Sequence, residues 1–285
     1  MSSVSLLSSA DAWTLVRAAT HDPAALSRAT HVPVGDPQRS FVDLYLPLCD
    51  ASASSPLVLG HLGQSLDGFI ATHAGESQWV TGPENLVHMH RLRALVDAVI
   101  VGPGTVAADD PRLTTRLVDG PNPLRVVLDP ASRLDPGRRV FADGAAPTLL
   151  MCAAGLVAPG ETRIGQAEML GVPRAADSRD ELDLHVVLDT LRRRGCTRVF
   201  VEGGGRTVSA FLQAGLLTRL HVTVAPVIIG DGRPGIRVPP VESLQACPRP
   251  VHAIYRMGGD VLFDFQIGTR APLDAAPNLP IQRVI

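Results

Sequence analysis

The chain of 285 residues contains no lysine, and all 26 of its basic residues are arginines. The absence of lysine excludes a Schiff-base lysine, a Walker-A lysine and pyridoxal-phosphate chemistry. An anionic ligand must therefore be held by Arg, Ser, Thr or backbone N–H groups, and the planar guanidinium of Arg suits phosphate well. A genome rich in GC base pairs also favours Arg codons, so the bias by itself needs no functional cause.

The chain also has few cysteines, a small net charge and no long apolar runs. The four cysteines lie far apart without C-x-x-C spacing, which predicts reduced structural thiols in a cytoplasmic protein and no metal site. No apolar run is long enough to cross a membrane, and the first residues lack the pattern of a signal peptide. The formal net charge of −2 creates no field that would draw the chain to nucleic acid or to a membrane surface.

The composition divides the chain into three parts. Residues 1–55 form an N-terminal appendage of unknown role, in which 10–19 predict a helix and the alternation over 41–46 predicts a half-buried strand. Residues 56–268 form the main domain. The rest, 269–285, is rich in proline and is expected to be a loose tail.

Short apolar segments alternate with helical patterns through the main domain. Strands are expected at 57–62, 98–101, 124–128, 147–152, 199–201 and 220–229, and helices at 81–97, 181–194 and 206–216. Two further strands, 251–256 and 261–267, have the pattern of a hairpin. This order of strands and helices predicts an α/β fold with a doubly wound, mostly parallel sheet and an antiparallel C-terminal hairpin.

The segment 81–97 carries the clearest helical pattern. Thr81 and Glu84 have the spacing of a capping box, and a proline in the first turn is tolerated. The predicted buried stripe consists of Leu86, Met89, Leu92 and Val96. Off this stripe, on a face expected to be solvated, lie His88, Arg91 and Arg93.

Two predicted strands end in glycine-rich turns. The strand 199–201 runs into Glu202 and then Gly203-Gly204-Gly205, which opens a helix. Glycine N–H groups at a helix start can face an anion, and the carboxylate lies where open α/β sheets bind ligands. Gly102-Pro103-Gly104-Thr105 is the second such turn. Neither is a GxGxxG fingerprint, and glycines that serve packing alone are the alternative.

Four motifs follow one another along the chain: Ser65-Leu66-Asp67-Gly68, then Gly75–Trp79 with Thr81-Gly82-Pro83, then Gly102–Thr105 running on to Asp109–Thr114, and finally Val201–Gly205. In this order and spacing they resemble the reductase domain family of the bifunctional riboflavin-biosynthesis deaminase–reductase. The resemblance covers roughly residues 57–267. It implies a dihydrofolate-reductase-like fold, a homodimer, and NADPH-dependent reduction of the ribosylamino group of a small phosphorylated pyrimidine to a ribitylamino group.

The resemblance also implies the site. Residues expected at the nicotinamide cofactor are Gly63, Trp79, Thr81, Thr105, Asp109, Gly204, Gly205, Arg206, Thr207, Val208, Ser209 and Ala210. Arg133 is a candidate partner for the 2′-phosphate of NADPH. Substrate contacts are expected from Ser77, Arg93, Leu113, Arg116 and Glu202, with the two arginines clamping the sugar phosphate. Glu202 and Asp67 are the candidate catalytic residues, although hydride transfer itself needs no protein nucleophile.

The chain departs from the family pattern at three positions. His61 and Phe69 stand where the family usually carries basic residues, and Pro130 stands where a small hydroxyl residue is usual. A neutral His anchors an anion less firmly than Lys. Residues 1–55 also lack the H-x-E and P-C-x-x-C pattern of a zinc deaminase, so neither deamination nor zinc is expected. Three alternatives stay open: a pterin or dihydrofolate-type reductase, a paralogue in a specialised pathway, and a nucleotide-binding protein without turnover.

Overall fold

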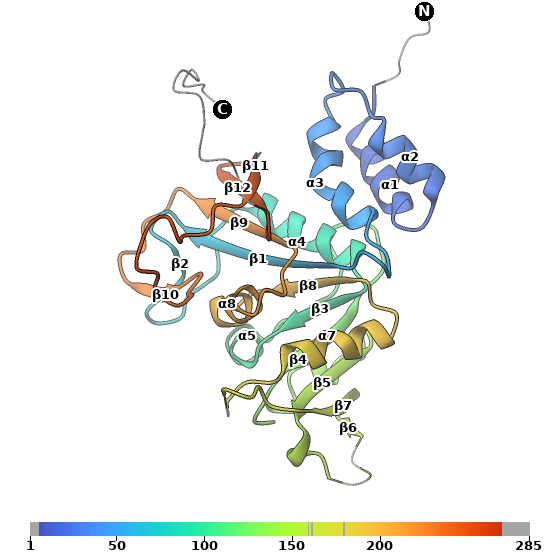
Figure 1. Cartoon of the computed structure of the whole chain (residues 1–285). Coiled ribbons are helices and arrows are strands. Elements are labelled where there is room, and N and C mark those ends of the chain that lie inside the picture. Colours follow the sequence, from blue (N-terminus) through green and yellow to red (C-terminus); the bar gives the residue numbers. More distant parts are fainter. Residues whose placement is uncertain (1–5, 159, 161, 179, 270–285) are drawn as a thin grey trace, which may run out of the picture.

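The structure is a computed structural model that describes residues 6–158, 160, 162–178 and 180–269. The tail expected at 269–285 therefore lies outside the described residues, apart from Thr269. A ten-stranded sheet forms the centre of the molecule, with helices on both of its faces. Three N-terminal helices pack at one side, close to α4 (Figure 1).

The sheet has a parallel centre and antiparallel edges. Its order is β11-β12-β9-β1-β8-β3-β4-β5-β7-β6. Every pair from β9 to β7 is parallel, whereas β11–β12, β12–β9 and β7–β6 are antiparallel. This arrangement confirms the predicted doubly wound sheet with a C-terminal hairpin. The strands are β1 (Leu57–Ser65), β3 (Ala98–Val101), β4 (Leu124–Leu128), β5 (Thr148–Ala153), β6 (Arg163–Ile164), β7 (Ala167–Val172), β8 (Arg198–Glu202), β9 (Arg219–Ala225), β11 (Val251–Met257) and β12 (Asp260–Gln266).

Alternate residues of the central strands point into two hydrophobic cores. In β1, Leu57 and Leu59 join the core that contains the N-terminal helices, whereas Val58 and Leu62 join the core under α7 and α8. A parallel strand buried on both faces is apolar nearly throughout, which made these strands easy to predict. The helices of the main domain are α4 (Pro83–Leu95), α5 (Pro103–Asp109), α6 (Arg139–Ala142), α7 (Leu184–Arg193) and α8 (Gly205–Gln213).

The strand expected at 41–46 is wrong. The N-terminal segment is entirely helical in its ordered elements, with α1 (Ser9–Ala19), α2 (Pro23–Thr30) and α3 (Arg39–Cys49). In α3, Val42, Tyr45, Leu48 and Cys49 are buried, and this spacing of three and four residues is that of a helix. A stretch of six alternating residues was too short to separate the two periods.

The buried face predicted for α4 is only partly correct. Leu92 and Val96 are buried as expected, but Leu86 is 44% exposed, and Asn85, His88 and Arg93 are buried instead of solvated. The helix begins at Pro83 with Gly82 as its N-cap. The Thr81 hydroxyl accepts a hydrogen bond from the Asn85 amide rather than forming a capping box. Polar side chains therefore share the buried face with the apolar residues.

Several other boundaries differ from the prediction. Helix α7 begins at Leu184 because the Asp183 carboxylate caps it, accepting from the backbone N–H groups of His185 and Val186. Strand β9 ends at Ala225, four residues before the expected end. Some short elements were not predicted: α2, α6, β6, β7, the 3-10 turn Ala154–Leu156, and the antiparallel pair β2 (Phe69–Thr72) and β10 (Gly232–Pro234).

Candidate functional site

The carboxyl ends of β1, β3 and β8 lie side by side, because β8 pairs in parallel with both of its neighbours. The two glycine-rich turns that follow β3 and β8 consequently meet. A Cβ atom on Gly102 would lie 2.3 Å from the Thr207 hydroxyl, and one on Gly204 would lie 3.0 Å from the Thr105 hydroxyl. Residues 100 positions apart in sequence thus form one surface at the end of the sheet.

The turn after β8 has a backbone that only glycine adopts easily. Gly203 and Gly204 have φ angles of 76° and 65°, and Gly204 is the N-cap of α8. A Cβ on Gly205 would lie 2.1 Å from the carbonyl oxygen of Gly235, so no larger residue fits there. The first N–H groups of α8 and the hydroxyls of Thr105 and Thr207 therefore border the same small space, which suits an anion.

The remaining residues expected along α8 divide into two groups. Val208 is fully buried in a hydrophobic core, and the Ser209 hydroxyl accepts a hydrogen bond from the backbone N–H of Arg237. These two side chains therefore hold α8 against the rest of the fold. Arg206 is exposed and Ala210 is half-buried, one turn along the same helix.

Glu202 and Arg93 form a buried bidentate ion pair at the end of β8. Arg93 Nε donates to Glu202 Oε2 at 2.7 Å, and Arg93 Nη2 donates to Oε1. Their side chains are only 6% and 7% exposed. Arg93 Nη1 also donates to the Thr114 carbonyl at 3.2 Å. The structure thus engages Arg93 as the counter-ion of Glu202, and the expected contact of Arg93 with the sugar phosphate stays a prediction.

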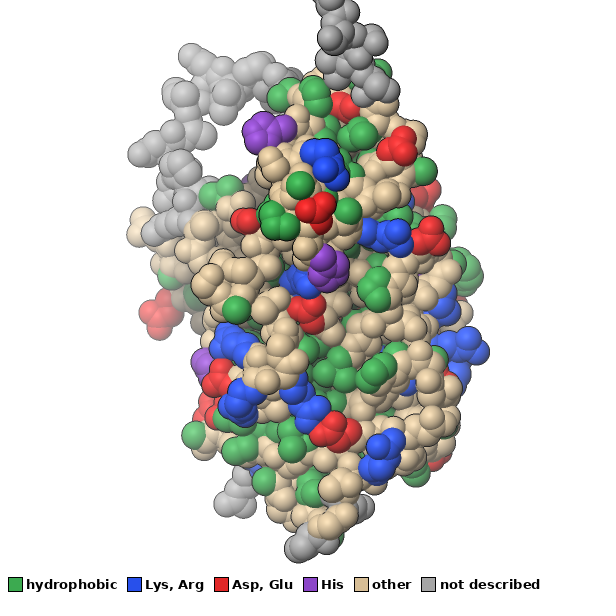
Figure 2. All heavy atoms as spheres, turned by 90° about the vertical axis from the view of Figure 1, so that its right-hand side faces the viewer, with side chains coloured by type: hydrophobic (Ala, Val, Ile, Leu, Met, Phe, Trp, Pro, Cys, Tyr) green, Lys and Arg blue, Asp and Glu red, His purple; other side chains and the backbone are tan. Residues whose placement is uncertain are grey.

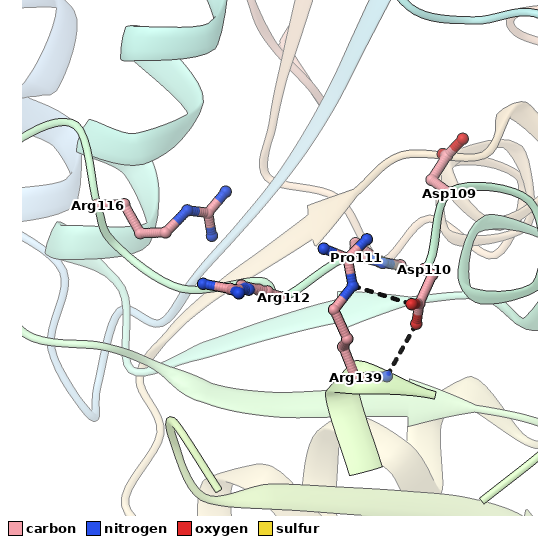
Figure 3. A pocket seen from close by; sticks show the side chains of 6 residues that line it. All are labelled: Asp109, Asp110, Pro111, Arg112, Arg116 and Arg139. Atoms are coloured by element: carbon pink, nitrogen blue, oxygen red, sulfur yellow. Dashed lines mark hydrogen bonds and ion pairs between the residues drawn. The ribbon is translucent and has the colours of Figure 1, made fainter. Parts of the chain in front are cut away.

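A pocket of about 330 Å³ lies beside this pair and is rich in arginine. Figure 3 shows Arg116 and Arg112 pointing toward one another from the irregular segment after α5. Arg139 faces them and is bound to Asp110, which accepts from its Nε at 2.9 Å and from its backbone N–H at 2.8 Å. Burial and the nearby guanidinium groups of Arg93 and Arg112 lower the pKa of Arg116. An anion in this pocket would relieve that repulsion.

Two expected site residues have a left-handed backbone that non-glycine residues rarely adopt. Leu113, fully buried, has a φ of 54°, and Trp79 has a φ of 69° with its side chain 80% exposed. Such backbone strain concentrates at functional sites. Next to them, the hydroxyl of Ser77 donates to Asp109 Oδ1 at 3.2 Å, so these two expected residues are also neighbours.

Gly63 and Thr81 adjoin each other at the end of β1, where a Cβ on Gly63 would lie 2.9 Å from Thr81 Cγ2. Arg133 has an exposed side chain in the turn after β4, where Asp129 accepts hydrogen bonds from the backbone N–H groups of Arg133 and Leu134. The predicted residues thus surround the carboxyl ends of β1, β3, β4 and β8.

Comparison with known proteins agrees with this geometry. The profile of the RibD C-terminal domain matches residues 56–252, which is more than half of the chain. The chain belongs to the RibD C-terminal domain family. This confirms the resemblance found in the sequence motifs.

Two relatives and one solved structure illustrate the likeness. The 2,5-diamino-6-ribosylamino-4(3H)-pyrimidinone 5′-phosphate reductase of Methanothermobacter thermautotrophicus is 35% identical over 218 residues, covering 74% of this chain and 98% of the relative. The riboflavin biosynthesis protein RibD of Bacillus amyloliquefaciens is 36% identical over 61% of this chain, but only 47% of the relative is covered. The chain therefore spans nearly all of the archaeal reductase and about half of the bacterial RibD protein.

The solved structure is the diaminohydroxyphosphoribosylaminopyrimidine deaminase/5-amino-6-(5-phosphoribosylamino)uracil reductase of Thermotoga maritima. It superposes with a TM-score of 0.61 at 26% identity, covering 80% of this chain and 60% of that one. The likeness confirms the expected fold of a RibD reductase domain, which is dihydrofolate-reductase-like.

Asp67, in the RibD-like SLDG motif, connects two loops. Its carboxylate accepts hydrogen bonds from the Ser65 hydroxyl at 2.5 Å and from the backbone N–H of Gly230 at 2.7 Å. These bonds, that of Ser65 first, lower the pKa of this exposed carboxyl to about 2. Asp67 therefore stays ionised near neutral pH and ties the SLDG turn to residues 229–230, and its catalytic role stays a prediction.

His61, which replaces a basic residue of the family, lies inside the protein. Its Nε2 is 3.0 Å from Asn85 Oδ1, and burial lowers its pKa to about 3. It belongs to a buried polar network that the sequence analysis missed. In the same network the Tyr45 hydroxyl is hydrogen-bonded to His88 Nδ1 at 2.8 Å, and His88 Nε2 lies 3.1 Å from His221 Nδ1. His61 is therefore a neutral core residue and not an anion ligand.

Within the described ranges, no helix is long and apolar enough to cross a membrane. Within the same ranges, no three His, Cys, Asp or Glu side chains are grouped so that they could hold a metal ion.

Proposed function

We propose that this chain is an NADPH-dependent reductase that converts the ribosylamino group of a phosphorylated pyrimidine of the 5-amino-6-(5-phosphoribosylamino)uracil type to a ribitylamino group, in riboflavin biosynthesis or a related pathway. The observation that carries the proposal is the adjacency of two subsites of different chemistry. A glycine-rich helix start with two threonine hydroxyls lies beside an arginine pocket, and the buried carboxylate of Glu202 precedes the glycine turn.

The glycine turn fits the pyrophosphate of the cofactor. The positive φ angles at Gly203 and Gly204 and the contact of Gly205 with Gly235 bring backbone N–H groups to the surface without side chains in the way. Thr105 and Thr207 would add hydroxyl donors. When bound there, NADPH supplies the hydride. The exposed Arg133, at the end of β4, is our candidate for the 2′-phosphate.

The arginine pocket fits the sugar phosphate of the substrate. Arg116 and Arg112 have no carboxylate partner among the ion pairs of the described residues, whereas Arg139 is neutralised by Asp110. Two guanidinium groups can hold a phosphate bidentately. An unphosphorylated pterin would leave this cluster without an anion, so the pocket favours the phosphorylated pyrimidine over a pterin or dihydrofolate.

Glu202 is assigned to the pyrimidine. A carboxylate held by Arg93 on both oxygens still has lone pairs that can accept hydrogen bonds from ring amino groups. Because it accepts rather than donates, the proton that the substrate nitrogen takes up on reduction comes from solvent. The protein's contribution is to align the hydride donor and acceptor, which is worth several orders of magnitude in rate.

We also propose a cytoplasmic homodimer. Its support is the family resemblance together with β11, an edge strand on which Val251 and Ile254 are 39% and 44% exposed. Unprotected apolar edge strands favour pairing with another chain.

The decisive experiment compares phosphorylated and dephosphorylated substrate with NADPH as reductant. In wild-type protein the phosphorylated substrate should have the higher kcat/KM. Arg116→Ala should lower kcat/KM for it roughly 10- to 100-fold and barely affect the dephosphorylated one, as expected for a charge-assisted hydrogen bond. Arg133→Ala is the matched control, since it should raise the KM for NADPH without changing the preference for phosphate. A preference for phosphate that survives in Arg116→Ala would contradict the assignment of the pocket.

A further inference from the structure

The N-terminal helices α1–α3 precede the region matched by the family, which begins at residue 56. They nevertheless share a hydrophobic core with the sheet and with α4. Figure 2 shows the face of the molecule on which they lie, where basic and acidic side chains are interspersed.

The segment contacts the loop that carries Arg116. The indole N–H of Trp13, in α1, donates a hydrogen bond to the backbone carbonyl of Asp119 at 3.1 Å. The guanidinium of Arg91, in α4, lies over the same indole at 5.9 Å and over the Phe41 ring at 4.8 Å. Trp13 therefore joins three elements: α1, α4 and the loop 114–122.

The loop itself is held closely against α4 at Arg116 and again at Gly120. The backbone N–H of Arg116 donates to His90 Nδ1 at 2.8 Å. Further along, a Cβ on Gly120 would lie 2.5 Å from the Cβ of Ala94, so the loop lies in van der Waals contact with the last turn of α4. Asp119, the acceptor of the Trp13 bond, is the residue before this contact.

His90 has the protonation state that this arrangement requires. Burial and the neighbouring Arg93 and Arg116 lower its pKa to about 4, so the ring is uncharged near neutral pH, and the bond from the Arg116 backbone N–H makes Nδ1 the nitrogen without a proton. Its other nitrogen, Nε2, lies 3.4 Å from Arg93 Nη1. The backbone of Arg116 is thus fixed from α4 on one side and the loop is closed by Trp13 on the other.

We infer that Trp13 is a positioning residue for substrate binding: its indole N–H fixes the loop 114–122, and so holds the Arg116 guanidinium in the pocket. The role of Arg116 in this inference rests on the proposed function. The N-terminal segment, which precedes the family domain, thereby holds the loop 114–122 of that domain in place. This contact of Trp13 with the loop is called the brace below.

The test uses Trp13→Phe in the full-length protein, because phenylalanine keeps a six-membered aromatic ring beside Arg91 and loses the N–H donor together with the five-membered ring of the indole. Val16→Ala is the matched control. Val16 is fully buried in the same helix, so its truncation loosens the packing of α1 and leaves the indole bond in place.

Amide hydrogen exchange provides a readout that does not depend on turnover. Trp13→Phe should accelerate exchange in residues 114–122, including the Arg116 amide, while Val16→Ala should leave this loop as in wild type. In steady-state kinetics Trp13→Phe should raise the KM for phosphorylated substrate roughly three- to tenfold, the effect of one lost hydrogen bond, with kcat changed less than about twofold.

The outcomes separate this inference from the proposed function. Unchanged exchange in Trp13→Phe, or equal acceleration in both variants, would overturn the positioning role even if the enzyme is active. Accelerated exchange confined to Trp13→Phe, with no turnover in wild type, would support the brace and refute the proposed reaction. Accelerated exchange with an unchanged KM would show that the brace does not serve substrate binding, which also overturns the inference.

Discussion

The buried pair of Arg93 and Glu202 allows a prediction whose magnitude follows from the structure. Both side chains are less than a tenth exposed, and their two parallel hydrogen bonds use both carboxylate oxygens. Arg93→Met would leave the Glu202 carboxylate buried without a counter-ion. Breaking a buried pair in this way costs about 3–5 kcal/mol, because the remaining charge has lost both its partner and its water. Glu202→Gln, which leaves the guanidinium unpaired, should cost a similar amount.

Removing both charges should cost less than the sum of the single changes. In the double variant Arg93→Met/Glu202→Gln no isolated charge is buried, so a large part of the loss is regained, as for buried pairs replaced by uncharged residues. Urea unfolding of the four proteins at one pH measures each free energy. The pairing account predicts a coupling energy of about 2 kcal/mol or more. Single variants that lose less than about 1 kcal/mol, or losses that simply add, would refute it.

Two further predictions follow. Folding stability should fall as the pH drops below about 6.5, because the unfolded chain then protonates histidines that stay neutral in the fold, where burial lowers the pKa of His61 to about 3 and that of His88 well below its ordinary value. Each such histidine contributes up to about 1.4 kcal/mol per pH unit to the pH dependence of the unfolding free energy. Urea unfolding measured over this pH range should show that His61→Gln loses one such contribution. An unchanged pH dependence in His61→Gln would count against a neutral, buried His61. Gly204→Ala should weaken NADPH binding, seen as a smaller rise of Tm with NADPH, because its φ of 65° and the Thr105 hydroxyl 3.0 Å from the added Cβ lie in the site. Gly215→Ala is the control, because Gly215 has a φ of 67° and an added Cβ would meet no atom within 4 Å. It should destabilise the fold similarly and leave NADPH binding unchanged. Equal effects of the two variants on NADPH binding would mean that the glycine turn serves packing alone.

The main strands could be predicted because they are buried on both faces. The segment 98–101 is apolar through its length, and 124–128 is apolar apart from Arg125, as expected for strands that are buried on both faces of a sheet. The hairpin at the C-terminus was predictable for a different reason, since Gly258 and Gly259 separate two alternating segments.

The polar part of the buried face of α4 could not be predicted from apolar periodicity. In α4, Asn85 and His88 are buried because they bond to His61 and Tyr45, partners from other parts of the chain. A polar residue with a satisfied partner is buried at little cost, and its partner is visible only in the fold. The nearest signal in the sequence is that Asn85 and His88 share one helix face.

The site was predictable to the level of its motifs. Glycine turns, the SLDG segment and the arginines near 112–116 are local signals, and they assemble at one end of the sheet. The pairing of Arg93 with Glu202 joins residues 109 positions apart, and the contact of Trp13 with Asp119 spans 106 positions. Such contacts depend on the packing of whole elements, which no local pattern contains.

The most direct measurement of the central claim is the initial rate of NADPH oxidation by the wild-type protein with 5-amino-6-(5-phosphoribosylamino)uracil, beside the same reaction with NADH and with the dephosphorylated substrate. Our account predicts substrate-dependent oxidation that is fastest with NADPH and phosphorylated substrate, and formation of the ribitylamino product in equal amount. Binding of NADPH without oxidation by either substrate would contradict a reductase of this specificity and favour a nucleotide-binding protein.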